Sequence, residues 1–251
     1  MSQPANTPKN NRTIIIALIA LLTVAVLVLS FVVSGALSSK EGKAAAPSSS
    51  TSQPKENTET KKELTPEIKA IIEQQHRKES NDPRALGNVN APVIIEMYSD
   101  YRCGHCRQWS LETLPKLQDF IDSGKIRIEY NSMPVLGDES VLIAQASHAA
   151  ALQNKFWEYH HELFANAPEA KPEALTELAG KIGMDTEKFA ADLKDPETVK
   201  AVDTERSRGT SLGITGTPAF LIGYSFVPGA YPADQFIKII NQELQRAENH
   251  K

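Results

Sequence analysis

The longest uncharged apolar stretch of the chain runs from Ile14 to Val33 and consists mainly of Ile, Leu, Val and Ala. At about 1.5 Å per residue it spans roughly 30 Å, the thickness of the hydrocarbon core of a bilayer. Lys9 and Arg12 precede it and no acidic residue does, so the positive-inside rule keeps the N-terminus in the cytoplasm. The pattern predicts a cytoplasmic tail over residues 1–13, a transmembrane anchor over 14–37 and an extracytoplasmic remainder.

A secretory signal peptide is the alternative interpretation of this segment. Ser34, Gly35 and Ala36 are small residues that suit cleavage. The apolar region of a signal peptide usually has about 7–15 residues, and this stretch is longer, which favours an uncleaved single-pass anchor in the cell membrane. Both interpretations place the rest of the chain outside the cytoplasm, where disulfides persist.

Residues 38–63 contain no large apolar residue and are rich in Ser, Thr, Lys, Glu and Ala. Such a composition cannot bury a core, so we expect a disordered, flexible linker between the anchor and the folded part. The remaining residues, 64–251, fall within the usual size range of one domain.

Apolar runs predict three strands in this domain. Val93–Tyr98 is short, β-branched and apolar on both faces, which is typical of a buried central strand. Ile126, Ile128 and Tyr130 alternate with polar residues, and this period of two predicts a second strand over 125–130. Residues 219–222 predict a third.

Segments whose apolar residues have helical spacing lie before and between these strands. Thr65-Pro66-Glu67 combines a capping hydroxyl, a first-turn proline and a first-turn acid, and predicts a helix to about Lys78. A second helix is expected from Gly104 to about Ile121, with a kink at Pro115, which lacks a backbone donor.

A block of helices is expected over about 139–209, and a last amphipathic helix begins at Pro232. Strands that alternate with helices in this order indicate an α/β sheet. The formal net charge is −4 and the sequence pI is near 5.9. Without a basic run or a stripe of aromatic residues and arginines, the chain does not have the features of a nucleic-acid-binding protein.

The chain contains two cysteines, Cys103 and Cys106, separated by Gly104 and His105. This pair can close one disulfide, which indicates redox chemistry. A purely structural disulfide would close so short a loop that it would contribute little entropy. A zinc site needs two further ligands, and no histidine has ligand spacing with the pair, so we predict no metal site.

Several motifs together resemble the DsbA-like thiol–disulfide oxidoreductases over essentially all of residues 85–250. They lie at residues 91–93, 98–106, 155–160 and 212–220. The resemblance implies a thioredoxin fold with an inserted helical subdomain, and a redox-active Cys103–Cys106 disulfide without any other cofactor. The anchor resembles that of the membrane-tethered members of Gram-positive bacteria.

Cys103 directly precedes a predicted helix, so its sulfur lies near unpaired N–H groups and the positive end of the helix dipole. Both lower the pKa of a thiol below its free value of about 8.5. His105 adds a donor that can become cationic near neutral pH. The resemblance implies that Cys103 is the exposed attacking sulfur and Cys106 the buried resolving one.

The resemblance also implies a cis peptide bond at Pro218, which would place this proline against the cysteine pair. The Thr217 backbone would then pair with an extended substrate strand. Gly104 and Tyr101, which flank Cys103, are further candidates for the substrate surface. His148, Trp157, His160 and His161 of the helical block are expected to serve packing, and Arg206 and Arg208 a solvated helix end.

Two positions depart from the family pattern. Many relatives have proline where this chain has Gly104, and the Gly-His dipeptide instead resembles that of protein disulfide isomerases. Some relatives place a buried acid six residues before the first cysteine, where this chain has Met97. Glu96 lies one place earlier and therefore on the opposite face of the strand, so we assign it no role in proton transfer.

These features predict an extracytoplasmic enzyme that introduces disulfides into reduced exported proteins, which would be its substrates. The resemblance implies a membrane quinone-linked partner that reoxidises the pair. No separate dimerisation domain is visible, so we expect a monomer. A disulfide reductase or isomerase of the same fold is the first alternative, and a chaperone-type binding module is the second.

Overall fold

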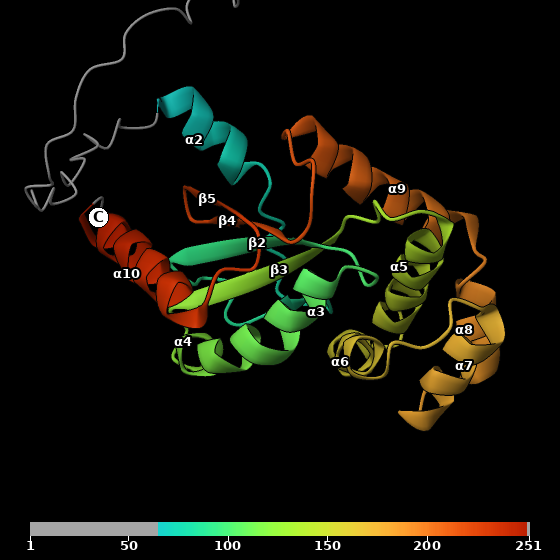
Figure 1. Cartoon of the computed structure of the whole chain (residues 1–251). Helices are drawn as coiled ribbons and strands as arrows, with labels where there is room; N and C mark the ends of the chain where they lie inside the picture. The colour runs from blue at the N-terminus through green and yellow to red at the C-terminus, as the bar shows by residue number, and fades with distance from the viewer. Residues whose placement is uncertain (1–64, 250–251) are drawn as a thin grey trace, which may run out of the picture. The chain divides into compact units, whose positions relative to one another are not determined.

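The computed structural model describes residues 65–249, in which a five-stranded sheet carries helices on both faces (Figure 1). The strands are β1 (Ala85–Leu86), β2 (Val93–Ser99), β3 (Ile126–Ser132), β4 (Ala219–Ile222) and β5 (Ser225–Pro228). Their order across the sheet is β1-β3-β2-β4-β5. The central pair, β2 and β3, is parallel, and the other neighbours are antiparallel.

The three predicted strands are confirmed as β2, β3 and β4, but β1 and β5 were missed. β1 has two residues, too few to show alternation. β5 has one buried residue, Val227, because it is an edge strand that follows a tight turn at Gly223. Neither strand therefore has the periodic pattern on which sequence prediction depends.

The first helix is shorter than predicted. α2 spans Pro66–Glu73 and is capped by the Thr65 side chain, as expected, but the chain leaves the helix well before Lys78. The backbone N–H groups of Arg77 and Lys78 donate to the Glu129 carboxylate at 2.7 and 3.1 Å. These contacts with the sheet compete with the helical hydrogen bonds and end the helix early.

The helical stretch after the cysteines changes its winding around Pro115, as predicted. It consists of α3 (Gly104–Gln108), a π-helical turn (Trp109–Thr113), a 3-10 turn (Leu114–Leu117) and α4 (Gln118–Asp122). Proline cannot donate a helical hydrogen bond and crowds the preceding turn. The regular α-helix is therefore interrupted on both sides of it.

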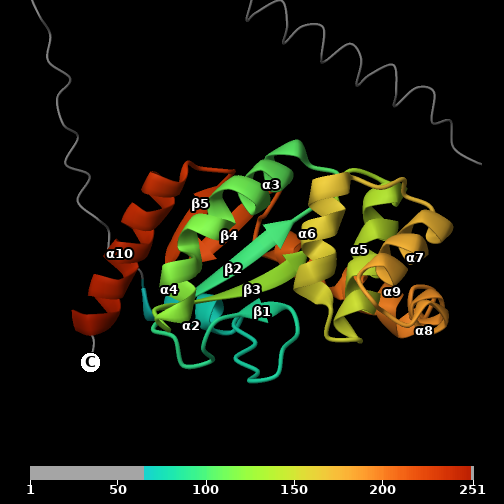
Figure 2. The ribbon, with the colours of Figure 1, turned by 90° about the horizontal axis from the view of Figure 1, so that it is seen from below.

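The predicted helical block lies between β3 and β4. Its members are α5 (Asp138–Ala151), α6 (Phe156–Asn166), α7 (Pro172–Lys181), α8 (Thr186–Asp192) and α9 (Pro196–Ser211). Figures 1 and 2 show α5 to α8 grouped beside the sheet, while α9 returns across one of its faces together with α2. The last helix, α10 (Ala233–Asn249), lies on the other face with α3 and α4.

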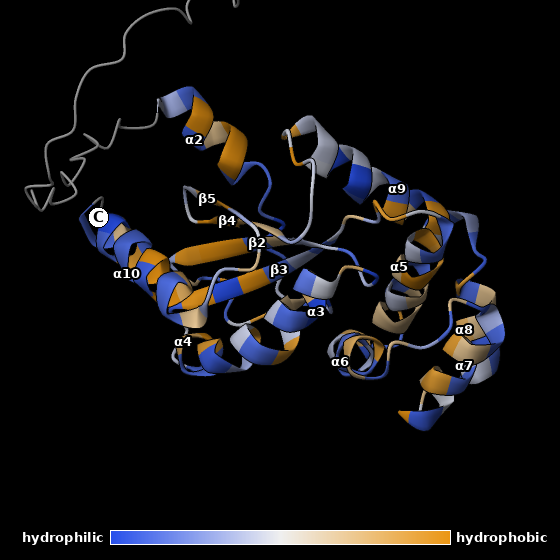
Figure 3. Ribbon diagram, viewed as in Figure 1, coloured by the Kyte–Doolittle hydropathy of each residue, from blue (hydrophilic) through white to orange (hydrophobic). Residues whose placement is uncertain are grey.

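The sheet has one apolar and one polar buried face, although every residue of β2 and β3 is buried. On the apolar face, Val93, Ile95 and Met97 belong to a core cluster that also contains Cys106. The hydropathy colours in Figure 3 show this apolar content along β2 and on the inner side of α10. The cluster extends into the helical block, so one core connects the sheet with the insertion.

The opposite face holds a network of buried charged and polar side chains. Glu96 accepts hydrogen bonds from Asn131 at 2.7 Å and pairs with His76 at 3.0 Å, and Arg127 donates to Glu129 at 2.6 Å. Burial raises the pKa of Glu96. The structure thus places Glu96 away from the cysteines, as the period of the strand predicts.

Gly209 allows α9 to approach the sheet closely. A Cβ atom at this position would lie 2.8 Å from Met133 Sδ and 3.2 Å from Tyr98 Cδ1. A larger side chain would therefore have to displace the Met133 and Tyr98 side chains or move α9 away from the sheet.

Within residues 65–249, no helix has the length and apolar content needed to cross a bilayer. The predicted tail at 1–13, anchor at 14–37 and linker at 38–63 lie outside the described residues and stay predictions.

Replacing Gly209 by leucine should lower the free energy of unfolding by about 1–3 kcal/mol, because the added atoms overpack the contact between α9 and the sheet. Urea unfolding measures the change. Ser207→Leu, at an exposed position of the same helix, is the control and should change it by no more than about 0.5 kcal/mol. Equal effects of the two substitutions would contradict the close-packing argument.

Candidate active site

The two cysteines lie where the C-terminal end of β2 meets the N-terminus of α3. Cys103 is the N-cap residue of α3, and its carbonyl accepts from the Arg107 N–H at 3.0 Å. Cys106, one helical turn further on, is fully buried, whereas Cys103 is half-buried. Both thiols are free. This placement confirms the predicted strand–CxxC–helix arrangement.

The environment of Cys103 favours its thiolate. A hydrogen bond from the Cys106 thiol, assisted by the backbone N–H groups of Cys106 and His105, lowers the pKa of Cys103 to about 5, although partial burial opposes this. In its protonated form the Cys103 thiol donates to the Thr217 carbonyl at 3.3 Å. At neutral pH Cys103 is therefore a nucleophile, since the thiolate is the reactive species.

The environment of Cys106 has the opposite effect. Burial raises the pKa of Cys106 well above its ordinary value, and the adjacent Cys103 sulfur raises it further. The Asp100 backbone N–H donates to Cys106 Sγ at 3.5 Å. The two sulfurs are thus unequal: one is ionised and accessible, and the other is protonated and enclosed.

Asp100 holds the turn before the cysteines. Its buried carboxylate accepts from the backbone N–H groups of Arg102, Val135 and Leu136 at 2.8, 2.8 and 3.1 Å, and from Ser140 Oγ at 2.7 Å. Asp100 was not among the predicted site residues. An aspartate between a buried strand and the CxxC was the available signal, but the sequence does not reveal its distant partners.

The peptide bond between Thr217 and Pro218 is cis, as the family resemblance implies. Pro218 is buried, and its carbonyl accepts from the Gly229 N–H at 2.8 Å. Thr217 is partly exposed and contacts Cys103 through its carbonyl. The structure therefore brings Thr217 and Pro218, more than a hundred residues further along the chain, next to the attacking sulfur.

Gly104 and His105 are exposed at the start of α3. A side chain at Gly104 would meet no heavy atom within 4 Å, so the surface beside Cys103 is open at this position. Gly104 stays a candidate for contact with a substrate, and His105 stays a candidate donor to the Cys103 sulfur.

Tyr101 lies inside the protein, with 7% of its surface exposed. Its hydroxyl pairs with His160 Nδ1 at 3.0 Å, and its ring packs on Tyr130 and Phe164. The helical insertion covers it from one side. Tyr101 is therefore a contact between the insertion and the sheet, and we leave it out of the substrate surface that the sequence predicted.

His160 serves packing, as predicted. Burial lowers its pKa to about 3, so the ring is neutral, and its second nitrogen pairs with Ser110 Oγ at 3.3 Å. Arg208 differs from the prediction of a solvated helix end, because it donates to Gln75 Oε1 at 2.7 Å and connects α9 with the end of α2.

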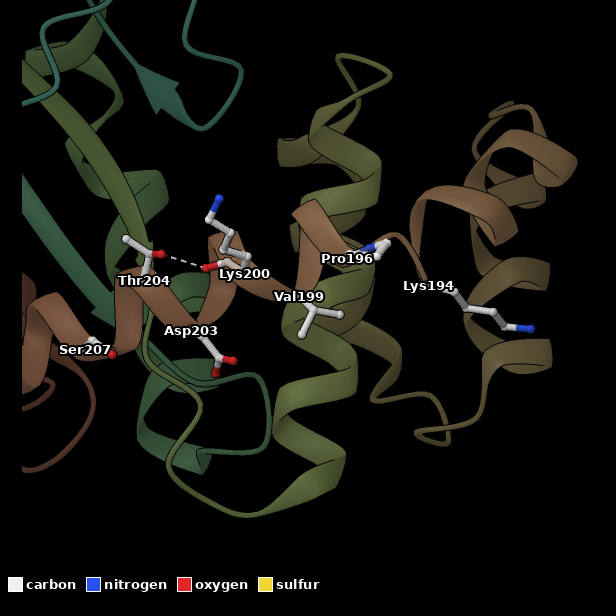
Figure 4. A pocket seen from close by; sticks show the side chains of 7 residues that line it. All are labelled: Lys194, Pro196, Val199, Lys200, Asp203, Thr204 and Ser207. Atoms are coloured by element: carbon white, nitrogen blue, oxygen red, sulfur yellow. Dashed lines mark hydrogen bonds between the residues drawn. The ribbon is translucent and has the colours of Figure 1, made fainter.

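A shallow hollow along α9 contains neither cysteine (Figure 4). The residues that line it are Lys194, Pro196, Val199, Lys200, Asp203, Thr204 and Ser207. Residues 65–249 contain no group of three or more His, Cys, Asp or Glu side chains placed to hold a metal ion.

Comparisons with known proteins agree with this geometry. A family model described as thioredoxin matches residues 79–242. The chain is 28% identical over 173 residues to the probable disulfide bond formation protein D of Bacillus cereus, covering 65% of this chain and 79% of that protein. It is 28% identical over 169 residues to disulfide bond formation protein D of Bacillus subtilis, covering 64% and 76%.

Two solved structures are also similar. Oxidised BdbD from Bacillus subtilis aligns with a TM-score of 0.61 at 25% identity, covering 66% of this chain and 94% of that one. The thiol–disulfide exchange protein alpha-DsbA2 from Wolbachia pipientis aligns with a TM-score of 0.58 at 26% identity, covering 70% and 95%.

The rate of Cys103 alkylation by iodoacetamide should rise with pH around a midpoint near 5 and level off by pH 7, because only the thiolate reacts. Mass spectrometry of the alkylated peptide measures it. In Cys106→Ala the midpoint should move up towards the free value of about 8.5, since the main stabilising hydrogen bond is removed. An unchanged midpoint in that variant would show that the helix terminus alone lowers the pKa.

Replacing Asp100 by alanine should lower the free energy of unfolding by about 2–4 kcal/mol, because backbone N–H groups lose their acceptor inside the protein. Urea unfolding of the reduced form measures this. Glu139→Ala removes a nearby acid that makes an exposed ion pair with Arg102 at 2.8 Å, and should cost less than about 1 kcal/mol. A loss at Asp100 no larger than at Glu139 would argue against its anchoring role.

Proposed function

Because the chain belongs to the thioredoxin family, we propose that it works as a thiol–disulfide oxidoreductase that introduces disulfides into exported proteins. The inequality of the two sulfurs is the main support: the Cys103 thiolate is stabilised and accessible, and Cys106 is enclosed. The relatives named disulfide bond formation protein D and the DsbA-like structures support the same activity.

The reaction begins with the oxidised pair. A substrate thiolate attacks Cys103 Sγ, the Cys103–Cys106 bond breaks, and its electron pair moves to Cys106. A second substrate thiolate then attacks the substrate sulfur of the mixed disulfide, and Cys103 leaves as a thiolate. The substrate is oxidised by two electrons and the enzyme is reduced by two.

A stabilised Cys103 thiolate drives this direction. The lower the pKa of a thiol, the faster it leaves from a disulfide, so Cys103 releases an oxidised substrate readily. Stabilisation of the reduced form also makes the disulfide a stronger oxidant. His105, which is exposed beside Cys103, can add a donor to the leaving thiolate.

The substrate segment would lie beside Thr217 and Pro218. Thr217 is partly exposed and in contact with Cys103, so its backbone can pair with an extended strand whose cysteine approaches the sulfur. The exposed Gly104 leaves room for that strand.

The N-terminal sequence suggests the compartment, and the redox cycle suggests the partners. The apolar stretch over 14–33 supports a single-pass anchor with the catalytic domain outside the cytoplasm, where reduced exported proteins would be the substrates. Each cycle leaves the pair reduced, so a membrane quinone-linked oxidase is the proposed acceptor of the electrons. The enzyme would act as a monomer, with the disulfide as its sole redox group.

An isomerase or reductase of the same fold is the second candidate. The Gly104-His105 dipeptide, which resembles that of protein disulfide isomerases, favours it. Isomerisation needs a pair that stays reduced in its compartment, and therefore a lower reduction potential than an oxidase has.

The reduction potential of the Cys103–Cys106 pair should lie closer to the value of about −120 mV found for a strong oxidant of this kind than to the value of about −270 mV for thioredoxin. Equilibration with glutathione redox buffers, followed by tryptophan fluorescence, measures it. With such a potential, the oxidised enzyme should also introduce a disulfide into a reduced, unfolded protein that has one cysteine pair. A value near −270 mV would refute the oxidase and favour the reductase.

A further inference from the structure

Disulfide transfer, if the proposed function holds, requires Cys106 to leave as an anion from a fully buried position. A charged group without hydrogen-bond partners is costly inside a protein. Some relatives place a buried acid at the position of Met97, which in this chain is an apolar member of the core cluster. Other groups must therefore stabilise the Cys106 thiolate here.

One donor is the backbone of Asp100, whose N–H points to Cys106 Sγ at 3.5 Å. The geometry of this N–H is fixed, because the Asp100 carboxylate and carbonyl are themselves held by hydrogen bonds. A single donor is a weak replacement for hydration of a thiolate.

Ser99 offers a second donor. It is the last residue of β2 and lies on the same face as Met97, two residues earlier, which packs in the cluster with Cys106. Its side chain is buried, and among the residues that the structure describes its hydroxyl has no hydrogen-bond partner. A buried hydroxyl without a partner is rare and calls for an explanation.

The neighbourhood of Cys106 provides that explanation. Ser99 directly precedes Asp100, whose N–H reaches Cys106 Sγ at 3.5 Å, so its side chain lies close to this sulfur. Burial and the Cys103 sulfur raise the pKa of Cys106, whereas the Asp100 N–H and the nearby Ser99 side chain lower it. The buried Ser99 hydroxyl is therefore a donor without a partner beside the sulfur that becomes charged during the reaction, and it is free to donate at that moment.

We propose that the Ser99 hydroxyl and the Asp100 N–H together form a two-donor site that stabilises the Cys106 thiolate during disulfide transfer. When the substrate thiolate bonds to Cys103, the electron pair of the broken S–S bond moves to Cys106. Ser99 keeps its proton and donates a hydrogen bond to the new thiolate. The second substrate thiol then gives its proton to Cys106, becomes a thiolate, and attacks the mixed disulfide.

The test is the rate at which excess dithiothreitol reduces the Cys103–Cys106 disulfide, followed by stopped-flow fluorescence. Ser99→Ala should lower the second-order rate constant about tenfold, the effect of one lost hydrogen bond to a charged sulfur. Threonine and valine side chains have nearly the same volume. The disulfide of the Ser99→Thr variant should therefore be reduced about tenfold faster than that of the Ser99→Val variant. This second pair separates the hydroxyl from packing even if the alanine variant folds poorly.

Two controls make the result specific. In a Cys106→Ala background, Ser99→Ala should leave the rate of Cys103 alkylation unchanged, because the hydroxyl acts on the other sulfur. Ser147→Ala removes a buried hydroxyl that bonds to the Ala144 carbonyl at 2.8 Å, and should leave the reduction rate unchanged.

Reduction of the Ser99→Ala disulfide at the unsubstituted rate would overturn the proposal. The proposal would also be overturned if Ser99→Ala, in the Cys106→Ala background, slowed Cys103 alkylation as much as it slows reduction of the disulfide. If dithiothreitol reduced the disulfide of the unsubstituted protein but that disulfide failed to oxidise a reduced protein, the proposed function would be wrong. The comparison of the Ser99 variants would still decide this inference.

Discussion

The hydrogen bonds of Asp100 are the interaction on which the active site depends. Its carbonyl accepts from the Cys103 N–H, its N–H donates to Cys106, and its carboxylate binds the loop that follows β3. One residue therefore sets the positions of both sulfurs relative to the sheet and to the start of the helical insertion. The charge is buried at little cost because four donors surround it.

Because this turn is held in place, the two sulfurs lie in different environments although the cysteines are close together in the sequence. Cys103 receives the donors of a helix N-terminus, and Cys106 faces the apolar side of the sheet. The insertion closes the site from one side through Tyr101 and His160, whereas the cis-proline segment leaves Thr217 partly open. The surface beside Cys103 is therefore covered on the side of the insertion and open at Gly104 and at the segment before β4.

Local signals made the elements around the cysteines predictable. β2 is a β-branched apolar run followed directly by CxxC and a helix, and the cis bond before Pro218 came with a family motif. The contacts of Asp100 and Tyr101 could not be predicted, because their partners lie in segments that are distant in the chain. From the sequence alone, an aromatic residue near the cysteines is compatible with an exposed or a buried position. The helix that covers Tyr101 decides between the two. The early end of α2 likewise results from tertiary contacts that override a good local pattern.

The polar face of the sheet has a consequence for strand alignment. Glu96 is opposite Glu129 in the register of β2 and β3, and Tyr98 is opposite Ala219 in that of β2 and β4. A slip of β2 by one residue would turn Glu96 towards the apolar face of the sheet, where its carboxylate would have no polar partner, and would turn Met97 towards the polar face. The charged network thus excludes alternative registers. Because Cys103 follows β2 and Thr217 precedes β4, side chains on one face of the sheet keep the Cys103 sulfur and the cis-proline segment aligned at its edge.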